Sequence, residues 1–232
     1  MSFRATENVI RTGFYTVRPG RLSYDAGLRL QQELLQRRAE TGTDFLLLLE
    51  HPPVITLGRG DSRDHLLVSA EQLATRGIEL RQVSRGGDIT YHGPGQLVGY
   101  PIIYLDPRQR DLHRYLRKLE QLLQQSAAEF GVEATSRPGK TGLWVNEKKL
   151  ASIGVGVRRW TTWHGFALNV EHRLEGFDTI VPCGLAGVAM TSLEACLDRP
   201  VTLSEVEAVI IEQFARVFSA DRLGDYEYST TP

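Results

Sequence analysis

A short glycine-rich stretch constrains the fold of this chain more than any other part of the sequence. Residues 85–96 read Arg-Gly-Gly-Asp-Ile-Thr-Tyr-His-Gly-Pro-Gly-Gln and contain four glycines and one proline. Because these residues interrupt helices and strands, the segment cannot be regular structure throughout. A loop of this composition lets backbone amides approach a ligand closely, so it predicts a ligand-binding loop. A tight hairpin between two strands would also explain the glycines.

A second informative stretch is an alternating strand that begins at a lysine. Side chains in a strand alternate between two faces, so Lys149 lies on one face with four apolar residues. These are Ala151, Ile153, Val155 and Val157. That face is apolar enough to point towards a core, where an ammonium group either pairs or loses its proton. The chain has only four lysines among its 27 basic residues, which adds weight to this one.

Cys183 offers the partner that would turn a buried lysine into a reactive site. It lies between Pro182 and Gly184, where the backbone is rigid on one side and unhindered on the other. A thiolate beside an ammonium group is an activated nucleophile. An inert cysteine beside a lysine that extends to solvent is the alternative interpretation.

Length and composition limit the remaining possibilities. A chain of 232 residues is long enough for one large domain; we expect a single catalytic domain over 1–232, with an ordered core at about 12–220 and a frayed tail at 226–232. The net charge of −1 does not indicate a nucleic-acid partner. Two cysteines, of which Cys196 is expected to be a core residue, fit a reducing cytosol. We find no signal peptide and no apolar run long enough for a membrane span, which together predict a cytoplasmic protein.

Hydrophobic periodicity predicts an α+β fold, a single domain with a mixed β-sheet flanked by helices. Capping boxes at 69–72 and 202–205 mark two helix starts. The expected helices span 23–39, 69–77, 111–130 and 202–218, and the expected strands span 13–17, 45–50, 54–57, 78–83, 97–105, 142–145, 150–157 and 165–170.

Two other patterns do not carry the chemistry that they first suggest. Residues 134–141 approach a phosphate loop, but the first glycine is missing and the chain continues as a strand where a helix is required. His92, His164, His172 and Cys183 lack the short spacing of metal ligands, so no metal site is expected.

Five motifs, in order, resemble the octanoyltransferases of lipoate biosynthesis, also called lipoyl(octanoyl) transferases. The resemblance covers about residues 13–218, and five motifs in order make it highly specific. The motifs are residues 51–59 (His-Pro-Pro-Val-Ile-Thr-Leu-Gly-Arg), 85–101, 149–154 (Lys-Leu-Ala-Ser-Ile-Gly), 164–170 (His-Gly-Phe-Ala-Leu-Asn-Val) and 181–184 (Val-Pro-Cys-Gly). No residue expected to do chemistry departs from the family pattern.

The resemblance implies a function and a mechanism. Such enzymes transfer an octanoyl group from octanoyl-acyl carrier protein to a lysine of a lipoyl domain, the first step of endogenous protein lipoylation. The acceptors would be lipoyl domains of 2-oxoacid dehydrogenases and the glycine cleavage H-type protein. Cys183 would be the catalytic nucleophile, and Lys149 would lower its pKa and act as acid and base. No cofactor is implied, because thioester exchange is nearly isoenergetic and amide formation is downhill.

The resemblance also implies a fold similar to the biotin and lipoate protein ligase catalytic domain, with three walls around the substrate. The implied substrate-binding residues are Arg85, Gly86, Gly87, Asp88, Ile89, Thr90, Tyr91 and His92 on the first wall, Ser152, Ile153 and Gly154 on the second, and Gly165, Phe166 and Ala167 on the third.

Two rival classes of protein remain. An ATP-dependent lipoate or biotin ligase would share the fold, the glycine-rich loop and the lysine, but it needs no cysteine nucleophile. A non-catalytic acyl-binding or cofactor-binding module would give Lys149 and Cys183 only structural roles.

Overall fold

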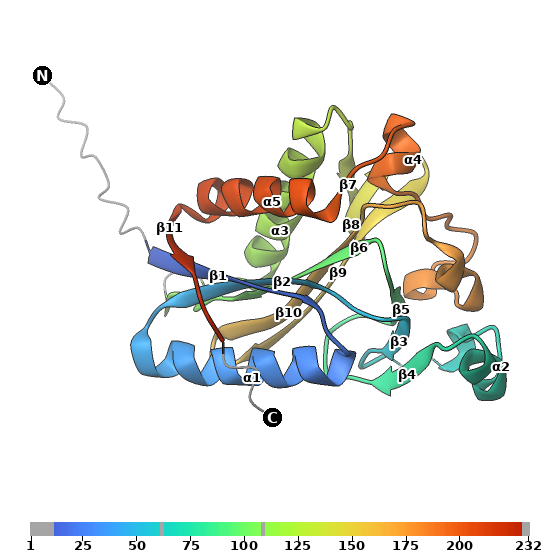
Figure 1. The fold of residues 1–232 in the computed structure, drawn as a ribbon, viewed down its shortest axis with the longest axis horizontal. Coiled ribbons are helices and arrows are strands. Elements are labelled where there is room, and N and C mark those ends of the chain that lie inside the picture. The colour runs from blue at the N-terminus through green and yellow to red at the C-terminus, as the bar shows by residue number, and fades with distance from the viewer. Residues whose placement is uncertain (1–11, 61–62, 108–109, 229–232) are drawn as a thin grey trace, which may run out of the picture.

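A computed structural model describes residues 12–60, 63–107 and 110–228. Its centre is an eight-stranded mixed sheet in the order β11-β1-β2-β6-β10-β9-β8-β7 (Figure 1). The pairs β1–β2 and β1–β11 are parallel, and the other neighbours are antiparallel. The strands are β1 (Thr12–Arg21), β2 (Asp44–Glu50), β6 (Gln96–Ile102), β7 (Thr135–Arg137), β8 (Lys140–Val145), β9 (Lys148–Arg158), β10 (Thr161–Asn169) and β11 (Ala220–Asp225).

Helices cover both faces of this sheet (Figure 1). Helix α1 (Tyr24–Thr41) packs on one face, and α3 (Leu112–Glu129) and α5 (Leu203–Phe218) pack on the other. The apolar run of β2 shows why both faces need cover. Leu46 and Leu48 belong to the core under α3 and α5, whereas Phe45, Leu47 and Leu49 belong to the core under α1.

A smaller sheet stands beside the large one. It has three strands in the order β4-β3-β5, formed by β4 (Glu79–Gln82), β3 (Val54–Leu57) and β5 (Ile89–His92). Helix α2 (Ala70–Thr75) contributes Leu73 to its apolar cluster. The described residues also include the short 3-10 helices η1 (Arg63–His65), η3 (Glu175–Thr179) and η4 (Pro182–Gly184) and the short helix α4 (Leu193–Leu197).

Local sequence signals predicted several elements correctly. Both capping boxes are present, between Ser69 and Gln72 and between Thr202 and Glu205. The turn after Val145 joins the predicted strands β8 and β9 into a hairpin. The α+β class with a mixed sheet and flanking helices is therefore confirmed.

Three strands, β5, β7 and β11, were not predicted. Within the glycine-rich segment 85–96, where a ligand-binding loop was expected, Ile89–His92 form strand β5, which pairs with β3. Strand β11 continues the fold to Asp225, beyond the expected core. Of the tail expected to be frayed, residues 229–232 lie outside the described residues, while the backbone N–H of Tyr226 donates to the carbonyl of Thr16 at 2.8 Å.

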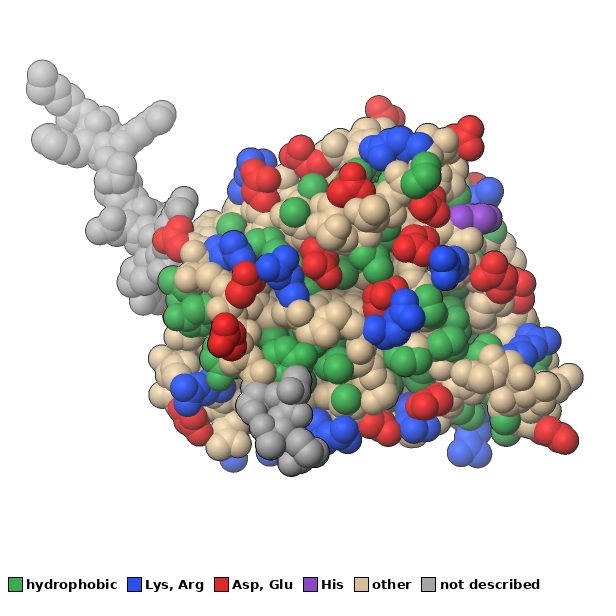
Figure 2. All heavy atoms as spheres, viewed as in Figure 1, with side chains coloured by type: hydrophobic (Ala, Val, Ile, Leu, Met, Phe, Trp, Pro, Cys, Tyr) green, Lys and Arg blue, Asp and Glu red, His purple; other side chains and the backbone are tan. Residues whose placement is uncertain are grey.

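The surface agrees with the near-zero net charge. Figure 2 shows acidic and basic side chains interspersed over the face that it presents. No helix in the described ranges has the length and apolar character that crossing a bilayer requires.

Candidate active site

The structure brings Lys149 and Cys183 into contact although 34 residues separate them in the chain. The Nζ atom of Lys149 donates to Sγ of Cys183 at 3.0 Å. Lys149 is 2 % exposed and belongs to β9, while Cys183 is partly exposed on η4. The hydroxyl of Ser152 lies 4.0 Å from the same sulfur. A buried lysine amine thus lies within hydrogen-bond distance of a thiol that solvent and a substrate can reach.

Backbone pairing on both sides holds the cysteine segment at this place. Before Cys183, Val181 N donates to the carbonyl of His65 at 2.8 Å. After it, Lys149 N donates to the carbonyl of Ala189 and Thr191 N donates to the carbonyl of Lys149, each at 2.9 Å. Strand β9 is thus hydrogen-bonded at Lys149 to residues 189–191, which follow the cysteine turn in the chain.

Cys183 has an unusual backbone conformation, with φ 56° and ψ 22°. Residues other than glycine rarely adopt this left-handed region, and strain of this kind collects at functional sites. Gly184 follows at φ +67°, and its N–H donates to the carbonyl of Val181 at 3.0 Å. The Pro-Cys-Gly sequence therefore forms a tight turn that presents the thiol.

The thiol and the ammonium open onto a cavity of about 400 Å³. Its volume lies in the range of small-molecule binding sites. Nearly all of the predicted site residues line it. They are Arg85, Gly86, Gly87, Asp88, Ile89, Thr90, His92, Lys149, Ser152, Ile153, Gly154, Gly165, Phe166, Ala167 and Cys183.

Tyr91 is the exception among the predicted substrate-binding residues, because it does not line this cavity. It belongs to β5, and its ring centroid lies 5.4 Å from that of Phe177. Its role in substrate binding stays a prediction.

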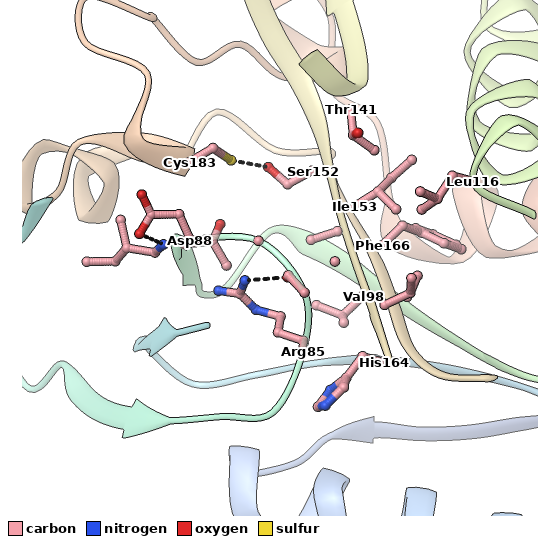
Figure 3. A pocket seen from close by; sticks show the side chains of 18 of the residues that line it. Arg85, Asp88, Val98, Leu116, Thr141, Ser152, Ile153, His164, Phe166 and Cys183 are labelled. Atoms are coloured by element: carbon pink, nitrogen blue, oxygen red, sulfur yellow. Dashed lines mark hydrogen bonds between the residues drawn. The ribbon is translucent and has the colours of Figure 1, made fainter. Parts of the chain in front are cut away.

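The cavity has an apolar side and a polar side (Figure 3). Ile153, Leu116, Phe166 and Val98 lie together on one side, and Arg85 and His164 lie on the other. The apolar side can take a hydrocarbon chain whose activated end meets Cys183.

Arg85 carries a buried charge at the polar side. Its guanidinium donates to the carbonyl and hydroxyl of Thr56, each at 2.8 Å, and to the carbonyl of Gly86 at 3.2 Å. Burial lowers the pKa of Arg85. Its hydrogen bonds to neutral oxygens fix the loop against β3 without cancelling the charge.

The buried histidines near Arg85 are neutral. Burial, with the charges of Arg85 and Arg59, lowers the pKa of His164 to about 3. Burial also lowers the pKa of His92 to about 3, and Nδ1 of His92 donates to Oε1 of Gln96 at 2.7 Å. Neither ring nitrogen of His164 has a hydrogen-bond partner among the described residues.

Several cavity residues were not predicted. His164 had been considered only as a metal ligand, although it stands next to a predicted site residue. The spacing of Leu112 and Leu116 indicates one apolar helix face, but tertiary packing decides which cavity that face lines. The other unpredicted residues are Tyr24, Val98, Tyr100, Gly139, Lys140, Thr141, Val155 and Leu185.

The segment that approaches a phosphate loop forms a β-hairpin. Its residues belong to β7 and β8, so no helix N-terminus follows Thr141. In the described part of the chain, no three His, Cys, Asp or Glu side chains gather to hold a metal ion.

Fold and site can now be compared with known proteins. The family model of the lipoyl protein ligase A/B catalytic domain matches residues 23–215. The chain belongs to this family of catalytic domains.

Within the family, the chain groups with the octanoyltransferases. It is 53% identical to the octanoyltransferase of Geobacter metallireducens over 196 residues, which are 84% of this chain and 89% of that protein. It is 43% identical to the octanoyltransferase of Clostridium kluyveri over 201 residues, 86% of each chain.

Solved structures share the fold at low identity. A lipoate-protein ligase A bound with ATP superposes with a TM-score of 0.76 at 16% identity, covering 95% of this chain and 90% of that one. A bi-partite lipoate protein ligase from Thermoplasma acidophilum has a TM-score of 0.74 at 18% identity, covering 94% and 88%. The implied ligase fold is therefore confirmed.

Proposed function

We propose that this protein transfers an octanoyl group from the thioester of an acyl carrier protein to a lysine of a lipoyl domain, through a thioester on Cys183. The observation that carries the proposal is the 3.0 Å contact between Nζ of Lys149 and Sγ of Cys183. The apolar side of the adjoining cavity and the names of the relatives support it.

The first half-reaction loads the enzyme. The thiolate of Cys183 attacks the carbonyl carbon of the donor thioester, and the bond from that carbon to the carrier sulfur breaks. The Lys149 ammonium gives its proton to the departing carrier thiolate. The products are octanoyl-Cys183, a carrier thiol and a neutral Lys149.

The second half-reaction uses the neutral lysine as a base. The acceptor amine attacks the octanoyl-Cys183 carbonyl, an amide bond forms and the bond to Sγ breaks. Lys149 takes the proton from the attacking nitrogen, which restores the ammonium and the thiolate. One lysine thus donates and recovers one proton in each cycle, and no nucleotide is consumed.

The acceptors in this proposal are lipoyl domains of 2-oxoacid dehydrogenases and of glycine cleavage H-type proteins. One solved relative of the same fold was described together with an E2 lipoyl domain, which supports this class of acceptor. Modification of these domains would be the first step of endogenous protein lipoylation.

Trapping the acyl-enzyme tests the proposal. After incubation with octanoyl-carrier protein, mass spectrometry should find one added octanoyl group, labile to hydroxylamine, on Cys183. Cys183→Ser should lose transfer by several orders of magnitude. Cys196→Ser is the matched control and should keep activity, because Cys196 is half-buried, packs against the core beside Thr191 and does not line the cavity. Normal turnover by Cys183→Ser would disprove the covalent route.

Omitting ATP separates this function from that of a ligase. Octanoyl-carrier protein and an apo lipoyl domain should give product without nucleotide or magnesium, and free octanoate with ATP should give almost none. A strict requirement for ATP would reassign the protein to the ATP-dependent ligases.

A further inference from the structure

Trp144 lies directly across from Lys149 in the sheet. Strands β8 and β9 are antiparallel, and Trp144 is the register partner of Lys149. Opposite residues on neighbouring strands project to the same face, so their side chains meet. The Nζ atom of Lys149 is 5.4 Å from the centroid of the indole ring, within the range of a cation–π contact. Both side chains are buried, Trp144 at 1% exposure.

Gly142, two residues before Trp144 on β8, also limits the course of the lysine. A β-carbon at Gly142 would lie 2.9 Å from Cε of Lys149 and 2.4 Å from the carbonyl oxygen of Ala151. The bare backbone therefore leaves space for the lysine methylenes. Beside Gly142 and Trp144, the side chain of Lys149 extends to the sulfur of Cys183.

The contacts of Lys149 lack a carboxylate. Among the residues that the structure describes, Nζ contacts the sulfur of Cys183 and the face of Trp144, and no acidic side chain forms an ion pair with it. The buried carboxylate of Glu120 is engaged with the N–H of Gly142 and with Arg117. An aromatic face attracts a cation without supplying a counter-charge, so the sulfur of Cys183 remains the hydrogen-bond partner of the lysine.

We propose that Trp144 is a positioning residue, whose indole face holds the Lys149 ammonium against Cys183 during acyl transfer. This inference rests on the proposed function. Arg137 and Lys140 also face the ring, at 4.8 and 5.8 Å, but both are more exposed than Lys149. Trp144 therefore acts on the reaction through the one buried cation that it touches.

The reactivity of Cys183 tests this role without requiring acyl transfer. The rate of alkylation by iodoacetamide, measured from pH 5 to 10 on Cys196→Ser protein, reports how well Lys149 stabilises the thiolate. Trp144→Leu should slow alkylation at neutral pH about tenfold and move the profile to higher pH, and Trp144→Phe should fall between it and the parent. Trp160→Leu is the control, since Trp160 is 40% exposed on the surface and should leave the profile unchanged.

A double-mutant cycle separates positioning from general packing. In a Lys149→Met background, the Trp144 substitutions should have no further effect on the alkylation rate, because the cation that they act through is gone. An unchanged profile in both Trp144 variants, or an equal slowing with and without Lys149, would overturn the inference. If Trp144→Leu does not fold, the same cycle can be run with Trp144→Phe, which keeps an aromatic residue in the core. The alkylation rate should then fall by about threefold.

The same experiment distinguishes failure of the inference from failure of the proposed function. If Lys149→Met slows alkylation and the Trp144 variants do not, only the role of Trp144 is overturned. If Lys149→Met is alkylated as fast as the parent protein, the lysine–cysteine pair of the proposed function fails, and the role of Trp144 fails with it.

Discussion

Gly184 packs so closely on Asp88 that a β-carbon at Gly184 would lie 2.4 Å from Oδ2 of Asp88. The same oxygen lies 2.5 Å from Nδ1 of His65, and Oδ1 accepts the N–H of Ile89 at 2.7 Å. One carboxylate therefore connects the glycine-rich segment, η1 and the residue that follows Cys183. The position of the thiol depends on this junction.

Gly184→Ala should damage the site more than the fold. A β-carbon at φ +67° strains the backbone by roughly 1–3 kcal/mol, and its collision with Asp88 should displace the cysteine turn. We expect acyl-enzyme formation, followed by mass spectrometry, to slow at least ~10-fold, in proportion to ~1.4 kcal/mol or more of lost positioning. Gly187→Ala is the matched control, because Gly187 has φ +75° but nothing within 4 Å of its β-carbon. Equal acylation rates in the two variants would contradict the proposed junction.

Lys149→Arg should not rescue the activity that Lys149→Met loses. Arginine keeps the charge, but it cannot release a proton near neutral pH, and its planar head does not fit the course between Gly142 and Trp144. Octanoyl transfer should fall at least ~100-fold in both variants, as expected when a general acid–base is removed. Lys148→Met, on the exposed neighbouring residue, should retain activity. Full activity of the arginine variant would restrict Lys149 to a purely electrostatic role.

Ile153→Ala should shift the preference for acyl-chain length. Ile153 lies on the apolar side of the cavity, and removing its side chain lengthens the space available to the substrate. Each buried methylene contributes about 0.8 kcal/mol, so two more should raise kcat/KM for a decanoyl donor relative to octanoyl by roughly tenfold. Competition assays with mixed donors measure the ratio. Val157→Ala changes the same strand outside the cavity and should leave the ratio unchanged.

Acid should destabilise the protein through its buried histidines. Burial lowers the pKa of His51 to about 4 and those of His92 and His164 to about 3. Below about pH 6.5 the unfolded chain protonates these rings and the folded chain does not, so stability falls as the pH decreases towards 4. Each ring should cost about 2 kcal/mol between pH 7 and pH 5.

Urea denaturation at the two pH values measures this loss. His164→Gln should reduce the difference between pH 7 and pH 5 by about one third, since one of three such rings is removed. His172→Gln, at an exposed position, should not change it. A pH-independent free energy of unfolding would show that the three rings protonate equally well in the folded chain.

The sequence predicted those parts of the fold that are specified locally. The capping residues Ser69 and Thr202 identified two helix starts, because a cap and the residue that it bonds are only three positions apart. Strand β5 was missed because its partner is distant in the chain, with Val54 opposite His92. Strand β11 (Ala220–Asp225) is mostly polar and has no alternating pattern, so only its pairing with β1 reveals it.

The site, like the fold, has parts that the sequence predicts and parts that only tertiary packing determines. Residue chemistry singled out Lys149 and Cys183 as a candidate pair, since a lysine on an apolar strand face needs a partner, and the family resemblance assigned their roles. The structure places the two side chains in contact. The contributions of Tyr24 and Leu116 could not be predicted, because helix packing brings them to the cavity. Gly165 has a packing role that the sequence does not show. A β-carbon at Gly165 would lie 2.2 Å from the carbonyl oxygen of Gly99, so a residue without a side chain is needed there for β10 to approach β6.

The parallel pairing of β1 with β11 has a consequence for how the chain is made. Thr12 is the register partner of Ala220, so the first described strand pairs with the last one. This pairing can form only after residue 220 has been synthesised. During synthesis, the outer backbone groups of β1 stay unpaired until residues 220–225 leave the ribosome, and an unpaired strand edge is open to pairing with other chains. The nascent protein therefore exposes the edge of β1 until residues 220–225 emerge, and pairing with the short strand β11 then covers that edge.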